Sequence, residues 1–212
     1  TMADLEEASE KVQMGPEKKS KIVPEDEKRI VAYHEVGHAI VGYEIGSEDR
    51  VHKITMIPRG KAGGYTLLLP EEEKSFHSKK HMLDKIATYF GGRAAEEIIF
   101  GKENITSGAG SDIYHATAIA KEIVTRFGMT DQFGPIFLDA TQEDYMFQRK
   151  YYSEQTGKEV DDEIRKIITE QYSRTKSILL DNREKLEEVT KILLEKETIM
   201  GPEFEAIMAD KN

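Results

Sequence analysis

The sequence predicts a mainly α-helical domain with a small β-hairpin or sheet beside one of its first helices. Apolar residues recur at spacings of three and four over several stretches, which is the period of an amphipathic helix. One stretch near residue 50 is instead rich in β-branched residues, and a turn-like segment separates it from a second such run. With 212 residues, the chain has room for one sizeable core, or for one domain with appendages.

Composition excludes several classes of function and of site. The formal net charge of -10 and the lack of a basic stripe with interleaved aromatic residues predict that nucleic acid is not a partner. No apolar run is long enough to span a membrane and the first residues are acidic, so we expect any membrane anchor to lie outside this chain. With no cysteine in the chain, only histidine and carboxylate side chains remain as zinc ligands.

The first long helix is predicted over residues 25–45. Pro24 fits the first helical position, acidic residues follow it in the first turn, and Gly46 ends the pattern. Gly37 and Gly42 each cost about 0.8 to 1 kcal/mol relative to alanine inside a helix, which suggests close approach by another backbone or by a ligand. The apolar, core-facing stripe contains two histidines and consists of Val31, His34, His38, Val41 and Ile45.

This helix carries the pentapeptide His-Glu-Val-Gly-His at residues 34–38, a two-histidine zinc motif. His34 and His38 are one turn apart on the same face, so both rings can bind one metal ion. Glu35 lies roughly 100° further round the helix, where its carboxylate can reach a metal-activated water without being a ligand. Zinc lowers the pKa of its water to about 7, and a neighbouring carboxylate can then move the proton to a leaving amine. The motif therefore predicts hydrolysis of an amide bond.

Further elements follow from turn and capping residues. Residues 51–69 are expected to form a hairpin, closed by Pro70. Ser78 is expected to cap a helix that runs to about residue 90, and Ser111 to cap another that ends near Phe127. Amphipathic patterns predict packing helices over residues 160–209.

A catalytic zinc site needs a third protein ligand, and the sequence leaves its identity open. Val41 and Glu44 stand where the metzincin pattern requires glycine and histidine, which excludes that class. A glutamate on a downstream helix would match the thermolysin-like class, whereas an aspartate at a helix start is ordinarily a favourable charge in a first turn. The remaining candidates are Glu96, Glu97, Asp112 and His115.

Beyond the zinc motif, an ordered set of strings resembles the peptidase domain of the FtsH family, the membrane-anchored ATP-dependent zinc metalloproteases. The resemblance covers nearly the whole chain. The strings that carry it are Ala32-Tyr33-His34, Ile57-Pro58-Arg59-Gly60, Gly63-Gly64-Tyr65, residues 91–101 (Gly-Gly-Arg-Ala-Ala-Glu-Glu-Ile-Ile-Phe-Gly), residues 106–112 (Thr-Ser-Gly-Ala-Gly-Ser-Asp) and Phe127-Gly128-Met129.

The resemblance implies roles for particular residues. It makes Asp112 the third ligand of one zinc ion per chain, beside His34 and His38, with Glu35 as the general base. The paired glutamates at 96–97 then become structural. It also implies a chain cut from a longer protein, in which residues 1–21 end the preceding ATPase lid and linker, and residues 22–212 are the peptidase domain.

The resemblance further implies polypeptide substrates, a homo-hexamer, and ATP bound only on an ATPase domain that this chain lacks. It implies attachment, through segments outside this chain, to a bacterial inner membrane or an organelle equivalent, with the peptidase on the cytoplasmic side. One departure is a shortened segment at 139–152, whose role the family pattern does not explain. Two rival interpretations are a zinc hydrolase of non-peptide amides and a helical assembly module whose metal site is inactive or structural.

Overall fold

The computed structural model describes residues 11–12, 24–46, 48–59, 63–72, 75–139 and 152–210. Most of the shortened segment at 139–152 lies outside these residues. The elements, in chain order, are α2 (Glu25–Ile45), β1 (Asp49–Thr55), β2 (Tyr65–Pro70), α3 (Lys79–Tyr89), α4 (Gly91–Phe100), η1 (Lys102–Asn104), η2 (Ser107–Ala109), α5 (Gly110–Lys121), η3 (Glu122–Arg126), α7 (Glu154–Asp181), α8 (Arg183–Lys196), β3 (Thr198–Met200) and α9 (Gly201–Ala209).

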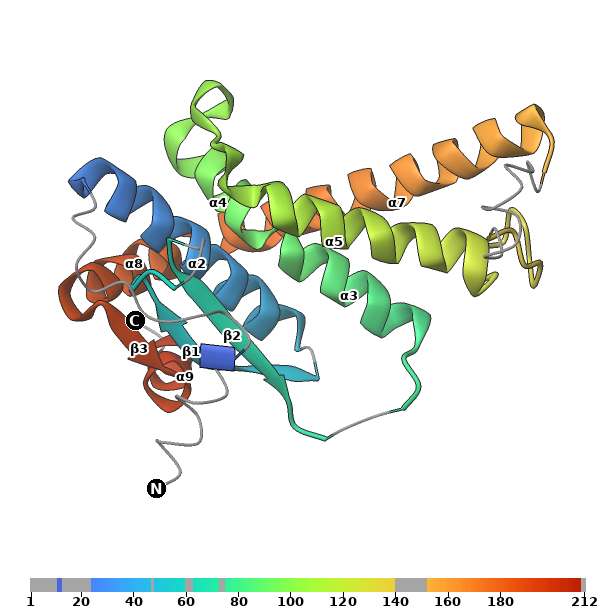
Figure 1. Ribbon diagram of the computed structural model, residues 1–212. Coiled ribbons are helices and arrows are strands. Elements are labelled where there is room, and N and C mark those ends of the chain that lie inside the picture. The colour runs from blue at the N-terminus through green and yellow to red at the C-terminus, as the bar shows by residue number, and fades with distance from the viewer. Residues whose placement is uncertain are drawn as a thin grey trace.

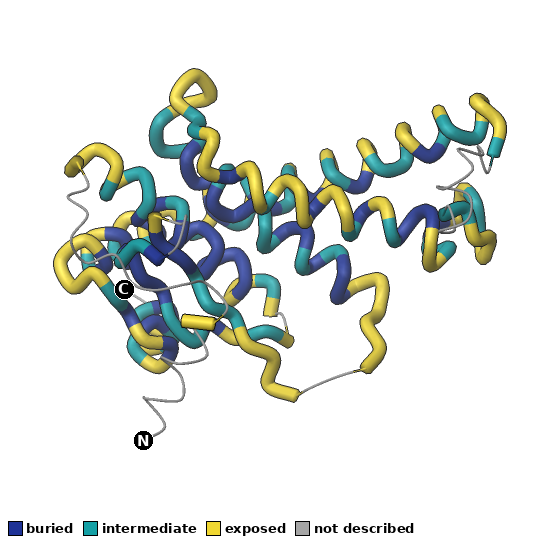
Figure 2. The backbone as a smooth tube through the Cα atoms, in the orientation of Figure 1, coloured by how far each residue is buried: buried dark blue, intermediate teal, exposed yellow. Residues whose placement is uncertain are grey.

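Helix α2 is the centre of the fold and has the predicted bounds. It begins after Pro24, carries acidic residues in its first turn, and ends at Gly46 in the left-handed conformation. It contacts β1 and β2 of the sheet as well as α3, α4, α7 and α8 (Figure 1). Its middle turns are buried over residues 35–42 (Figure 2). A motif on this helix is therefore held by several elements at once.

The predicted hairpin is present as part of a three-stranded antiparallel sheet in the order β2-β1-β3. Ile54 of β1 lies opposite Thr66 of β2 and opposite Ile199 of β3. Strand β3 was not predicted from the sequence, because its three residues come just after a helix and are too few to show an alternation of apolar and polar residues. Within the described part of the chain, β2 is an edge strand with β1 as its one partner.

The glycines of α2 mark close contacts, as their energetic cost suggested. A Cβ on Gly37 would lie 2.4 Å from the carbonyl oxygen of Gly91, and a Cβ on Gly91 would lie 2.6 Å from the carbonyl oxygen of Gly37. The backbones of α2 and α4 therefore touch where they cross. A Cβ on Gly42 would lie 2.8 Å from the side chain of Leu68 on β2.

Two apolar clusters form the core. One joins α2 to the sheet, α8 and α9, and includes Ile40, Ile54 and Phe204. The other joins α3, α5, η3 and α7, and includes Ile86 and Ile123. The second cluster packs α3 and α5 along the long helix α7 on one side of the molecule (Figure 1).

Two helix limits differ from the sequence prediction. Helix α5 begins at Gly110 and has no side-chain cap, so the cap predicted at Ser111 is wrong; the preceding turn η2 already occupies that end. The same helix continues as a π-helical turn, η3, up to Arg126, so its end agrees with the one predicted near Phe127. Helix α7 begins at Glu154 rather than near residue 160, because Ser153 caps it. Its first turns are polar, so the apolar pattern used for the prediction did not include them.

No helix among the described residues is long and apolar enough to cross a membrane.

Candidate metal centre

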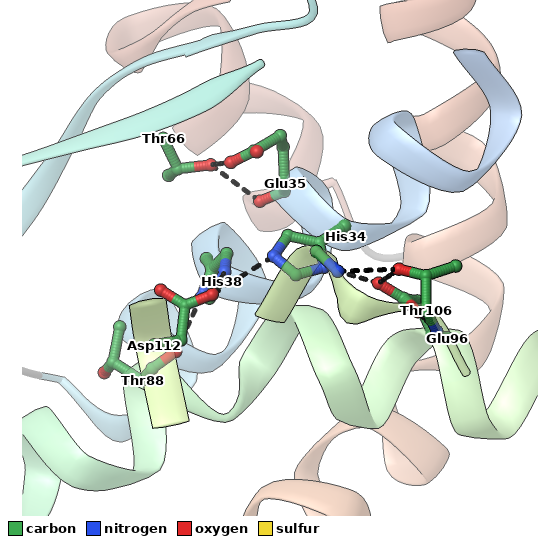
Figure 3. A network of polar contacts seen from close by, with 9 residues as sticks. His34, Glu35, His38, Thr66, Thr88, Glu96, Thr106 and Asp112 are labelled. Carbon is green, nitrogen blue, oxygen red and sulfur yellow. Dashed lines mark hydrogen bonds and ion pairs between the residues drawn. The ribbon is translucent and has the colours of Figure 1, made fainter. Parts of the chain in front are cut away.

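Three side chains from two helices converge on one point. His34 and His38 lie one turn apart on α2 with their ring centroids 4.8 Å apart, and Asp112 reaches them from the first turn of α5 (Figure 3). Asp112 Oδ2 lies 3.3 Å from His34 Nε2 and 3.6 Å from His38 Nε2. Ligand atoms around a tetrahedral zinc ion, at bond lengths of about 2.0 to 2.1 Å, are separated by roughly 3.3 Å. The spacing of these atoms therefore fits one shared ion.

The other nitrogen of each ring is fixed by a second partner. His38 Nδ1 lies 2.8 Å from the carbonyl oxygen of Thr88, and His34 Nδ1 lies 2.7 Å from Glu96 Oε1. A carbonyl oxygen only accepts, so His38 Nδ1 carries the proton and leaves the Nε2 lone pair free. A carboxylate on His34 Nδ1 favours the same tautomer. Each ring thus has a hydrogen-bond acceptor at Nδ1 and an Nε2 that faces the other two side chains, which is the usual arrangement of histidines that bind a metal.

Glu96 is fully buried, and both of its carboxylate oxygens are bound by protein. Oε1 contacts His34 and accepts from the Thr106 hydroxyl at 3.2 Å, while Oε2 accepts from the Thr106 backbone N–H at 2.7 Å. The carboxylate therefore lies behind the His34 ring, on the side away from Nε2. The same contacts fix the segment that leads from α4 to Asp112, because Thr106 immediately precedes η2.

The other two candidates for a third ligand lie elsewhere. Glu97 accepts a hydrogen bond from the hydroxyl of Tyr172 on α7 and lies 3.3 Å from Lys176 Nζ. His115 is exposed and stacks on Tyr89, with ring centroids 5.5 Å apart. Among the described residues, His34, His38 and Asp112 are the one set of three side chains whose ligand atoms lie within 4.8 Å of one another.

Packing of α4 against α2 holds His34 in place. A Cβ on Gly92 would lie 2.4 Å from both Nε2 and Cδ2 of the His34 ring. Only glycine leaves room for the ring at this point. The Gly91-Gly92 pair thus serves both the backbone contact with α2 and the seat of the first histidine.

Carboxylates around the histidines favour positive charge at this point. Burial alone would lower the pKa of His34, but hydrogen bonds with Asp112 and Glu96 outweigh it and raise that pKa to about 10. Burial likewise would raise the pKa of Asp112, but contacts with the two histidines hold it well below its usual range. A buried site that stabilises added positive charge is suited to a metal cation.

Glu35 faces the same space from the neighbouring position of α2. Its side chain is buried, and its Oε2 lies 2.9 Å from the hydroxyl of Thr66 on β2 (Figure 3). Glu35 is not one of the three side chains whose ligand atoms could hold a metal ion together. A groove of about 960 Å³ runs over this region, and its lining includes His34, Glu35, His38, Asp112 and residues 63–68.

Similarity to known proteins extends over nearly the whole chain. The model of peptidase family M41 matches residues 21–207. The chain belongs to peptidase family M41. Among similar proteins, the ATP-dependent zinc metalloprotease FtsH 3 of Petrotoga mobilis is 47% identical over 214 residues, which is 98% of this chain and 33% of the relative. The ATP-dependent zinc metalloprotease FtsH of Thermotoga maritima is 44% identical over 217 residues, which is 100% of this chain and 35% of the relative.

A third relative, the ATP-dependent zinc metalloprotease FtsH of Bacillus subtilis, is 45% identical over 202 residues, which is 92% of this chain and 31% of the relative. The chain thus spans about a third of the length of these relatives. The family resemblance predicted from the sequence is confirmed.

Sequence reasoning missed the residues that support the site. Thr66, Thr88 and Thr106 bind Glu35, His38 and Glu96 respectively, and no periodicity or motif singled them out as partners. Thr106 stands inside a string that carries the family resemblance, which was the one available signal. The other two act through contacts between elements, which a linear pattern does not show.

Proposed function

We propose that this M41 chain is a zinc-dependent endopeptidase domain in which His34, His38 and Asp112 hold the metal and Glu35 is the general base. The observation that carries the proposal is the convergence of two Nε2 atoms and one carboxylate oxygen on a single point. The donor set of two histidines and one carboxylate, with each ring held from behind, fits zinc. When bound, zinc supplies Lewis acidity and lowers the pKa of water to about 7.

The residues of the chain then perform the proton transfers. Glu35 takes a proton from the attacking water as the water oxygen bonds to the carbonyl carbon of the scissile peptide. Glu35 next gives that proton to the amide nitrogen as the C–N bond breaks, which releases an amine and a carboxylic acid. Burial of Glu35 beside the metal position keeps bulk water from competing for the proton.

The edge of β2 supports a polypeptide as the substrate. Residues 65–68 of β2 line the groove, and the strand has one edge without a partner among the described residues. An extended peptide can add to such an edge through main-chain hydrogen bonds, which gives little side-chain specificity. This feature favours a peptidase over a hydrolase of small amides, and over an assembly module with an inactive metal site.

The wider organisation is proposed from the family and from the names of the relatives. Residues 22–212 form the peptidase domain, residues 1–21 end a preceding ATPase lid and linker, and the family match begins beside this boundary, at residue 21. The whole protein would be an ATP-dependent homo-hexamer that degrades unfolded or membrane proteins, since the relatives are named ATP-dependent zinc metalloproteases. Membrane attachment through segments outside this chain would place the peptidase on the cytoplasmic side of a bacterial inner membrane or an organelle equivalent.

A single sample tests the core of this proposal. The purified 212-residue chain should contain one zinc ion per chain and cleave casein, and Glu35→Gln should keep the zinc while casein cleavage falls by about two to four orders of magnitude. Glu44→Gln, which changes an exposed residue of the same helix, should leave both values unchanged. Zinc loss in Glu35→Gln, or stoichiometric zinc with no cleavage by the unaltered chain, would contradict the proposal.

A further inference from the structure

Thr66 connects the edge strand of the sheet to the proposed general base. It lies on β2 opposite Ile54 of β1, lines the groove, and is half-buried. Its hydroxyl lies 2.8 Å from the backbone carbonyl oxygen of Glu35 and 2.9 Å from Glu35 Oε2. The Thr66 hydroxyl is thus a direct hydrogen-bond donor to the Glu35 carboxylate.

A hydroxyl group has one hydrogen and can donate to only one of these two acceptors at a time. The carbonyl of Glu35 lies inside α2, where the N–H four residues further on is its ordinary helical partner. That carbonyl therefore stays satisfied whether or not Thr66 donates to it. The hydroxyl is free to donate to the carboxylate, which is the stronger acceptor while it is charged.

This contact affects how the carboxylate works. A glutamate side chain has several rotatable bonds, and the bond at Oε2 holds one oxygen so that Oε1 remains to accept a proton from water. Once Glu35 carries the proton, it is neutral and accepts less strongly. The Thr66 hydroxyl can then turn to the backbone carbonyl only 2.8 Å away, so neither state of Glu35 leaves the hydroxyl without an acceptor.

We propose that Thr66 is a positioning residue for Glu35, and that it couples peptide binding along β2 to the orientation of the base. Residues of an edge strand turn their N–H and C=O groups alternately toward the neighbouring strand and away from it. A peptide that pairs with the free edge of β2 therefore fixes the backbone that carries the Thr66 hydroxyl. The inference rests on the peptidase function proposed above.

The test is Thr66→Val in the 212-residue chain, because valine keeps the branched shape that suits a strand and removes only the hydroxyl. For cleavage of an unstructured fluorogenic peptide, we expect kcat to fall by about 10- to 100-fold, the range for loss of a group that orients an active-site residue. KM and zinc content should stay close to those of the unaltered chain. Thr66→Ser, which restores a hydroxyl, should recover most of kcat.

Two further variants separate positioning from a general effect on the fold. Thr198→Val removes a hydroxyl from the opposite edge strand, where Thr198 bonds Thr55, and should leave kcat unchanged. In Glu35→Gln, the additional change Thr66→Val should lower kcat by less than two-fold, because Thr66 acts through the carboxylate that is already lost.

The outcomes distinguish the two proposals. If the unaltered chain does not cleave peptides, the proposed function fails whatever Thr66 does. If the unaltered chain is active, three results overturn the role of Thr66: an unchanged kcat in Thr66→Val, no recovery in Thr66→Ser, or effects that multiply in the double variant. If Thr66→Val does not fold, the comparison of Thr66→Ser with Thr66→Ala decides in the same way, with recovery in serine alone as the supporting result.

Discussion

The two faces of α4 carry neighbouring glutamates, Glu96 and Glu97, that have different partners. Glu96 faces α2 and binds His34 and Thr106, whereas Glu97 faces α7 and binds Tyr172 and Lys176. Burial alone would raise the pKa of each carboxyl, yet hydrogen bonds outweigh it and lower both pKa values. A buried, ionised carboxylate near a zinc motif is therefore no proof of a metal ligand. What each glutamate does depends on which element its helix face meets.

The largest effect on zinc binding should come from Asp112, which lies on neither face of α4. Asp112→Ala removes a ligand of the proposed zinc site. Zinc affinity should therefore fall by more than about 100-fold, which is the upper end of the range for losing a group that only orients a ligand. The variant should lose zinc on dialysis against a mild chelator nearly as readily as His38→Ala, and casein cleavage should disappear with it. Stoichiometric zinc in Asp112→Ala, together with zinc loss in Glu96→Ala or Glu97→Ala, would show that the thermolysin-like arrangement is correct.

An intermediate effect on zinc affinity is expected for Glu96, on the face of α4 that meets α2. Glu96→Ala removes the acceptor behind His34 and the anchor of Thr106, so zinc affinity and casein cleavage should each fall by about 10- to 100-fold. A zinc titration monitored by a competing chelator measures the affinity, and excess zinc should restore part of the cleavage. If Glu96→Ala bound zinc as tightly as the unaltered chain, Glu96 and Glu97 would not differ in their effect on the zinc site.

The smallest effect on the zinc site is expected for Glu97, on the face of α4 that meets α7. Glu97→Ala leaves the Tyr172 hydroxyl without its acceptor, so the free energy of unfolding should fall by about 1 to 3 kcal/mol while zinc affinity and kcat stay unchanged. Thermal unfolding of the zinc-loaded chain measures the loss.

The effect of Glu97→Ala should also depend on pH in a definite direction. Because the pKa of Glu97 is lower in the folded chain than in the unfolded chain, its ionisation stabilises the fold above the unfolded pKa. That stabilisation is lost as the pH falls through the folded pKa. The difference in unfolding free energy between Glu97→Ala and the unaltered chain should therefore shrink on acidification, and a constant difference would contradict the assignment.

Local patterns in the sequence were enough to place several elements and the first two metal-binding candidates. Helix α2 has its predicted limits because each end is marked by adjacent residues, Pro24 and the acidic first turn at the start and Gly46 at the end. The relation of His34 to His38 follows from the helical repeat alone. The cap at Ser78 and the hairpin also follow from local chemistry, and both are present.

Only the tertiary structure decided which carboxylate reaches the histidines. His34 contacts Glu96 across 62 residues of chain and Asp112 across 78, and no local rule relates positions so far apart. The answer depends on the close crossing of α2 and α4 at Gly37 and Gly91, which turns one glutamate behind the His34 ring.

The third strand of the sheet and the partner of the proposed base also depend on packing between distant segments. Strand β3 lies more than 140 residues from β1 in sequence, as the hydrogen bond between the hydroxyls of Thr55 and Thr198 shows, so its pairing has no local signal. The contact of Thr66 with Glu35 exists because α2 packs on the sheet at that register. The sequence by itself determined the chemistry carried by α2, since a helix fixes its own side-chain spacing. Packing between distant segments decided the partners of that chemistry, since those distances are set only when the whole core forms.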